Sequence, residues 1–189
     1  FTGASARLRG GATFETEGLE RMRMGDGGAA VYDGGYYNVG VRPTAEDLGL
    51  GADLAGFPLS FSRQEVIGAK IDVFEFNIFT FEVPGPVLPG ERLAVDGAFK
   101  VPSLRNVELT APYFVGGGHA TLLQAVEFYD RGGDFADHNR ENLAPDISPI
   151  GFTPQEEDAL VAFLKALTDP RVDQELAPFD HPQLFVPDG

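Results

Sequence analysis

The chain has 189 residues, and its 29 Asp and Glu residues outnumber its 14 Lys and Arg residues, which gives a formal net charge of −15 at pH 7. This balance excludes nucleic acid as a partner, because binding to phosphates relies on cationic side chains, and it disfavours an anionic membrane surface for the same reason. No apolar run approaches the roughly 20 residues of a membrane-spanning helix, so we expect no membrane insertion.

The composition predicts one loop-rich domain over residues 1–189. A hydrophobic content of 43% suffices for a core, whereas 24 glycines and 14 prolines indicate many turns and irregular loops. The absence of cysteine excludes disulfides and thioether-attached haem for this chain alone. The chain does not begin with Met and shows no signal peptide, so we expect it to be processed or cut from a longer protein.

The first half of the chain gives weak signals for regular structure. Residues 1–51 are rich in glycine and are predicted as loop, with one helical turn at 16–24. Residues 65–81 alternate apolar and polar side chains with an ambiguous period, and a small β-hairpin at 66–81 is one interpretation. Prolines at 84, 86 and 89 then interrupt regular structure.

The second half contains two well-signalled helices. Thr121 and Gln124 have the spacing of a capping box, and an apolar face follows until Gly132 and Gly133. A second capping box begins at Thr153, and the apolar stripe of residues 160–167 ends before Asp169 and Pro170. Residues 134–151 are predicted as ordered loop. Long loops in a compact domain favour organisation around a ligand, such as a large flat cofactor.

No stand-alone catalytic motif is present, and the candidate residues have structural alternatives. His119, His138 and His181 lack the spacing of metal ligands; His119, between a triglycine and a capped helix, could equally face a site or be a structural histidine. Tyr129 lies beside the apolar face of its helix. It is either a core tyrosine or, because a phenolate favours ferric iron, an axial haem ligand.

Two further features could bind ligands. Arg105 follows an extended Val-Pro segment and could clamp a carboxylate such as a haem propionate, with an ordinary salt bridge as the alternative. Thr110 and Pro112 offer backbone carbonyl oxygens, which suit calcium only where other oxygen donors converge.

Residues 99–114, FKVPSLRNVELTAPYF, and 121–133, TLLQAVEFYDRGG, closely resemble the C-terminal haem domain of bacterial di-haem cytochrome c peroxidases and their MauG-type relatives. Residues 32–44 are similar to the loop that follows the haem-attachment motif in larger members. The resemblance covers most of the chain. It implies a mainly α, cytochrome c-like fold, with a loop-rich insertion and post-haem segment over 1–98 and a helical haem-capping part over 99–189.

The resemblance also implies cofactors, site residues and a periplasmic or otherwise extracytoplasmic location. Tyr129 corresponds to the distal axial ligand of the C-terminal haem, which is Met in the peroxidases and Tyr in MauG-type members. Thr110 and Pro112 correspond to carbonyl ligands of a calcium ion between two haem domains, and Arg105 falls in the haem-lining segment.

The chain departs from the family pattern in ways that affect its function. The Cys-x-x-Cys-His motif is missing, and we expect it just before Phe1; Val115 stands where many relatives have a histidine. The haem c must therefore come from a haem-bearing N-terminal fragment or subunit. We predict part of a di-haem peroxidase-type oxidoreductase that passes electrons or oxidising equivalents between haems, with a redox protein as a possible partner. The alternative is a haem-less cytochrome domain that serves as a binding or assembly subunit.

Overall fold

The computed structural model describes residues 6–7, 13–14, 19–68 and 87–178. Within these ranges the chain forms five α-helices, two 3-10 helices labelled η1 and η2, and four two-stranded antiparallel pairs. Contacts divide it into two units, which are described separately: unit 1 comprises 1–102 and 129–150, and unit 2 comprises 103–128 and 151–189. Within these same ranges, no helix has the length and apolar character needed to cross a membrane.

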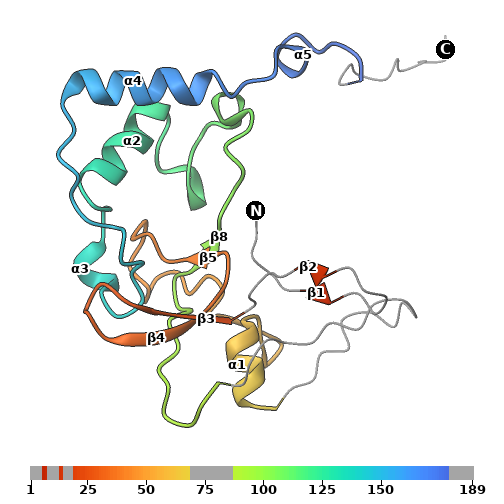
Figure 1. Ribbon diagram of the computed structural model, residues 1–189, viewed down its shortest axis with the longest axis vertical. Coiled ribbons are helices and arrows are strands. Elements are labelled where there is room, and N and C mark those ends of the chain that lie inside the picture. Colours follow the sequence, from red (N-terminus) through yellow and green to blue (C-terminus); the bar gives the residue numbers. More distant parts are fainter. Residues whose placement is uncertain (1–5, 8–12, 15–18, 69–86, 179–189) are drawn as a thin grey trace, which may run out of the picture. The chain divides into compact units, whose positions relative to one another are not determined.

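Unit 1 is built around a β-hairpin (Figure 1). Strand β3 (Leu19–Arg23) pairs with β4 (Ala29–Asp33), and the parallel bridge between Val31 and Leu93 adds a third segment to β4. The main-chain bonds from Val31 N to Arg92 O and from Ala94 N to Val31 O are both 2.8 Å long. The hairpin's core consists of Met24, Ala30, Tyr32 and Ala94, with Met22 and Tyr37 packed against it.

Short elements complete unit 1. They are the pairs β1 (Ala6–Arg7) with β2 (Thr13–Phe14), β5 (Tyr36–Tyr37) with β8 (Phe99–Lys100), and β6 (Asp53–Leu54) with β7 (Phe57–Pro58), and the helices α1 (Phe61–Val66) and α3 (Ala136–Asn139). Ser60 caps the N-terminus of helix α1, because its hydroxyl accepts a hydrogen bond from Arg63 N at 3.0 Å. The buried carboxylate of Asp33 also accepts from Phe61 N and Ser62 N at 2.6 and 3.0 Å. Asp33, the last residue of β4, thus anchors the first turn of α1.

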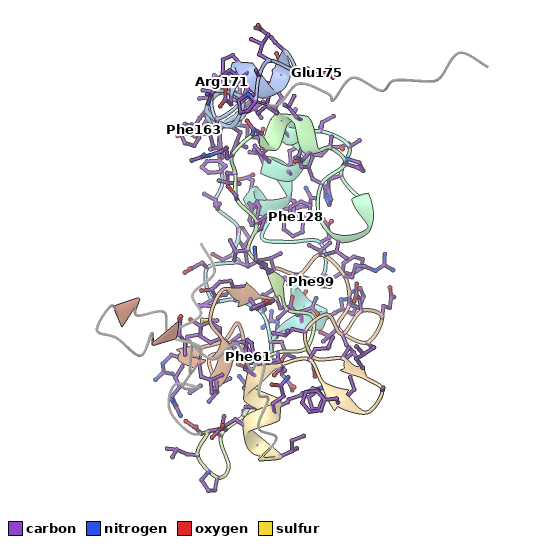
Figure 2. All side chains as sticks on the ribbon, turned by 90° about the vertical axis from the view of Figure 1, so that its right-hand side faces the viewer. Phe61, Phe99, Phe128, Phe163, Arg171 and Glu175 are labelled. Atoms are coloured by element: carbon purple, nitrogen blue, oxygen red, sulfur yellow. The ribbon has the colours of Figure 1, made fainter. Side chains whose placement is uncertain are left out.

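Unit 2 contains most of the helical structure of residues 103–178. Its elements are η1 (Val107–Thr110), η2 (Val115–Gly117), most of α2 (Leu122–Asp130), α4 (Pro154–Lys165) and α5 (Pro170–Asp173). Leu122, Val126 and Phe128 of α2 are buried, whereas α4 has no fully buried residue. In Figure 2 Phe128 lies among other side chains and Phe163 of α4 lies at the margin, in agreement with their exposures of 0% and 55%.

The two helices predicted from capping boxes are confirmed as α2 and α4. The helical turn predicted at 16–24 is wrong, because residues 19–23 form strand β3. The loop predicted over 1–51 contains this hairpin, and the loop predicted over 134–151 contains the single turn α3. Glu65 and Val66 of the ambiguous 65–81 segment end α1, and its residues 69–81 lie outside the described ranges. The mainly α expectation therefore holds for unit 2, whereas short strand pairs dominate residues 19–58.

Candidate haem-capping site

Tyr129 lies near the C-terminal end of α2, and local sequence signals fix both ends of this helix. Thr121 Oγ1 accepts from Gln124 N, and Gln124 Oε1 accepts from Thr121 N, each at 3.2 Å. Gly132 and Gly133 follow the helix with φ values of +81° and +87°, which a side chain would strain. A Cβ atom on Gly132 would lie 2.8 Å from the Pro149 nitrogen. The helix therefore ends within one turn of Tyr129.

The side chain of Tyr129 extends the buried stripe of α2 but is not itself buried. Leu122 and Val126, seven and three positions earlier, are 6% and 3% exposed, whereas Tyr129 is 42% exposed. Desolvation nevertheless raises the pKa of its phenol above the ordinary value of 10.0. The phenol is therefore protonated at neutral pH, and a metal ion that binds its oxygen has to displace that proton.

The sequence predicted Arg105 as a carboxylate clamp, and in the structure Arg105 is an exposed residue. The neighbouring backbone is anchored to the end of α4, because Asn106 N donates to Leu167 O at 3.1 Å and Asn106 Oδ1 accepts from Asp169 N at 2.7 Å. The pKa of Asp169 is lowered to about 2, first by the hydrogen bond from Arg171 and to a smaller extent by the charge of Arg105. Arg105 is thus an exposed cation on a stretch of backbone that is anchored to the end of α4.

Thr110 and Pro112, the predicted calcium ligands, lie at the end of η1 and in the exposed turn that follows it. Tyr113 supports this turn: its backbone N donates to His119 O at 2.7 Å and its hydroxyl to Val107 O at 3.1 Å. Among the residues that the structure describes, no three His, Asp or Glu side chains gather in a way that could hold a metal ion. Calcium at these carbonyls therefore stays a prediction.

His119 is a core residue of unit 2. It is 8% exposed, and its ring packs edge-on against Phe114 and Phe128 with centroid distances of 4.9 and 5.5 Å. This environment favours the structural alternative that the sequence left open. His138 is exposed beside Phe135, with a centroid distance of 5.9 Å, and His181 lies outside the described ranges.

Sequence analysis missed a buried amide pair that orders the segment following β5 in unit 1. Asn139 is 1% exposed; its Oδ1 accepts from Thr44 N at 2.9 Å, and its Nδ2 donates to Arg42 O and Phe135 O at 2.9 and 2.7 Å. Asn38, 2% exposed, donates from Nδ2 to the Asp96 carbonyl at 2.9 Å. No periodicity marks these asparagines, because Asp96, Thr44 and Arg42 lie 58 to 97 positions away from them in the chain, although Phe135 lies four positions from Asn139.

Sequence comparison finds similarity to parts of cytochrome-c peroxidases and of MauG proteins. No family model matches the chain. It is 42% identical over 91 residues to the cytochrome-c peroxidase IdrP1 of Denitromonas iodatirespirans, and 47% identical over 78 residues to the cytochrome c551 peroxidase of Nitrosomonas europaea. It is 33% identical over 134 residues to the methylamine utilization protein MauG of Paracoccus denitrificans. The resemblance drawn from the sequence is therefore confirmed: the chain is similar to parts of cytochrome-c peroxidases and of MauG.

These matches cover only part of each protein. They span 47%, 41% and 61% of this chain, and 23%, 19% and 33% of the respective relatives. Among solved structures, a MauG-like protein associated with microbial copper homeostasis matches 46% of this chain and 29% of its own, with 37% identity and a TM-score of 0.40.

Proposed function

We propose that this chain is the haem-capping part of a peroxidase-type oxidoreductase. The haem c is attached to another polypeptide segment, because the chain has no cysteine. The relatives are cytochrome-c peroxidases and MauG, which supports a peroxidase-type redox role. In this proposal the chain works outside the cytoplasm, and the haem-bearing segment is its first partner.

One observation carries the assignment of the ligand. Tyr129 occupies a position at which the stripe of α2 predicts burial, yet 42% of its side chain is exposed. An apolar stripe that ends in a part-exposed tyrosine would suit a planar apolar group whose metal binds a phenol oxygen. The partial exposure of Tyr129 supports this assignment.

The residues of the chain would have separate tasks when haem is bound, and the haem itself would supply the redox chemistry. Tyr129 would lose its proton and bind the iron through its oxygen; an anionic oxygen stabilises a higher oxidation state of iron better than a thioether does. Arg105 would hold a propionate through paired N–H donors. The carbonyl oxygens of Thr110 and Pro112 would bind calcium together with oxygen donors from elsewhere.

The test is a comparison of Tyr129→Phe with Tyr36→Phe in the protein purified together with its haem-bearing partner. We expect Tyr129→Phe to remove the phenolate-to-iron charge-transfer absorption, to change the ferric EPR spectrum and to shift the reduction potential of one haem. Tyr36→Phe, which removes a half-buried phenol from β5, should leave all three unchanged.

Two results would contradict the proposal. One is a native preparation without a Soret band, which would favour the haem-less binding subunit. The other is a haem spectrum that is identical in Tyr129→Phe and in the parent protein, which would leave the peroxidase-type role standing but remove Tyr129 from the iron.

A further inference from the structure

Readily oxidised side chains gather around the β3–β4 hairpin of unit 1. The chain has no Trp or Cys, and only two Met and five Tyr. Both methionines, Met22 and Met24, belong to the apolar cluster of this hairpin together with Tyr32 and Tyr37. An oxidising equivalent that reaches this hairpin therefore meets several of the most readily oxidised groups of the chain.

Tyr32 has a proton acceptor at its hydroxyl. The antiparallel register of β3 and β4, the two strands paired in Figure 1, sets Glu20 directly opposite Tyr32, and the Tyr32 hydroxyl donates a hydrogen bond to Glu20 Oε2. Tyr113 differs, because its hydroxyl donates to the main-chain carbonyls of Val107 and Glu108, which cannot take up a proton at neutral pH. The carboxylate therefore gives Tyr32 a base that Tyr113 lacks.

Burial keeps Tyr32 protonated until it is oxidised. The side chain is 5% exposed, and desolvation, assisted by the hydrogen bond to Glu20, raises the pKa of its phenol well above 10.0. Removing an electron from a phenol makes it a strong acid. In a buried site the charged product would be costly, so electron loss is favoured when the proton leaves along an existing hydrogen bond.

Tyr37 gives the hairpin a second ring. The centroids of Tyr32 and Tyr37 are 5.4 Å apart with an interplanar angle of 43°, within the usual range for interacting aromatic rings. Tyr37 is only half-buried, and it is the β5 residue paired with Phe99 of β8. The two rings thus lead from the core of unit 1 toward its surface.

We infer that Glu20, Tyr32 and Tyr37 form a proton-coupled electron-transfer site. One electron passes from Tyr32 to a high-potential metal-complex oxidant, while the phenolic proton moves to Glu20 Oε2 and leaves a neutral tyrosyl radical. One electron from Tyr37 then reduces this radical, Glu20 returns the proton to Tyr32, and the Tyr37 phenol releases its own proton to solvent. In the cell the oxidant would come from the haem site, so the physiological role rests on the proposed function.

The experiment uses the full chain and photogenerated tris(bipyridine)ruthenium(III), a one-electron oxidant that needs no haem. Tyrosyl radical is followed by transient absorption and by EPR of frozen samples at about pH 7. We expect a long-lived radical on Tyr32 or Tyr37 in the parent chain and a clearly lower radical yield in Tyr32→Phe. Glu20→Gln retains a hydrogen-bonding side chain but removes the base, and should slow radical formation at least about tenfold.

Tyr36→Phe is the matched control. Tyr36 precedes Tyr37 on β5, and neighbouring strand residues point to opposite faces, so its removal should leave the radical unchanged. Equal radical yields in Tyr32→Phe and Tyr36→Phe would overturn the inference, as would an unchanged rate in Glu20→Gln. Should Tyr32→Phe not fold, the rate in Glu20→Gln decides alone, because that variant keeps the buried ring.

This test is independent of the haem proposal. A radical that depends on Tyr32, together with a native preparation that lacks a Soret band, would contradict the proposed function and leave the electron-transfer site standing. Haem ligation by Tyr129 without a radical that depends on Tyr32 would support the proposed function and contradict the electron-transfer site.

Discussion

Single residues show how far side-chain chemistry can be anticipated in this chain. Sequence pattern placed Tyr129 on the apolar face of a helix, and α2 confirms the stripe of Leu122 and Val126. It could not decide whether the phenol is buried, because exposure depends on what packs over the helix. Asn139 had no signal at all, since its bonds to Arg42 and Thr44 connect distant segments.

Asn139→Ala should destabilise the protein by about 2–4 kcal/mol, because it removes a buried amide and leaves the Arg42 and Phe135 carbonyls and the Thr44 N–H without this partner. Urea unfolding measures the change. The control is Asn142→Ala, a half-buried asparagine in the turn after α3, which should cost less than about 1 kcal/mol. An equal decrease in the free energy of unfolding in both variants would show that the hydrogen bonds of the Asn139 amide do not stabilise the protein more than those of an ordinary half-buried asparagine.

Elements differ in how much of their formation is local. Helices α2 and α4 begin at capping boxes and end at nearby Gly or Pro signals, so their existence could be predicted from a few neighbouring residues. The β3–β4 hairpin was mistaken for a helical turn and loop. Its strands are stabilised by contacts with residues 87–95, which are some 60 positions away in the chain.

Two ion pairs fasten those distant residues to the hairpin and make its stability depend on pH. Arg92 Nη2 lies 2.9 Å from Asp26 Oδ1, and Arg21 Nε lies 2.6 Å from Glu91 Oε1. The hydrogen bonds from these arginines lower the pKa of Asp26 and of Glu91 to about 2. Because both values lie below the ordinary 3.8 and 4.5, the pairs stabilise the folded state above about pH 4. The stabilisation is lost as the pH falls through about 2.

The double variant Asp26→Asn/Glu91→Gln should therefore be less stable than the parent at pH 7 and equally stable at about pH 2. Urea unfolding at a series of pH values measures this convergence. Asp137→Asn, which breaks an exposed pair with Arg140 beside α3, is the control and should follow the parent curve throughout. A constant difference between double variant and parent at every pH would argue against the ion pairs as its cause.

At the scale of the whole molecule, charge is the property that the sequence fixes most directly. A net charge of −15 disfavours the compact state through self-repulsion and attracts cationic partners over long range. Raising the ionic strength from about 0.01 M to about 0.15 M shortens the screening length from about 30 Å to about 8 Å.

We expect this increase in salt to raise the melting temperature at pH 7. A relief of about 1 kcal/mol corresponds to about 2–4 °C in a chain of this size. Calorimetry at pH 4.4, the isoelectric point of the sequence, is the control, because little net charge remains there to be screened. The same upward shift at both pH values would point to a general salt effect and contradict self-repulsion.

Several features followed from the sequence by itself: the acidic charge, the lack of cysteine for attaching a haem, the two capped helices and the relationship to peroxidases and MauG. They depend on composition or on residues within a few positions of one another. Only the tertiary structure decided that Tyr129 is exposed, that His119 is a core residue, and that Glu20 meets Tyr32. Each of these depends on strand register or on packing between segments far apart in the chain, and neither leaves a mark in local periodicity.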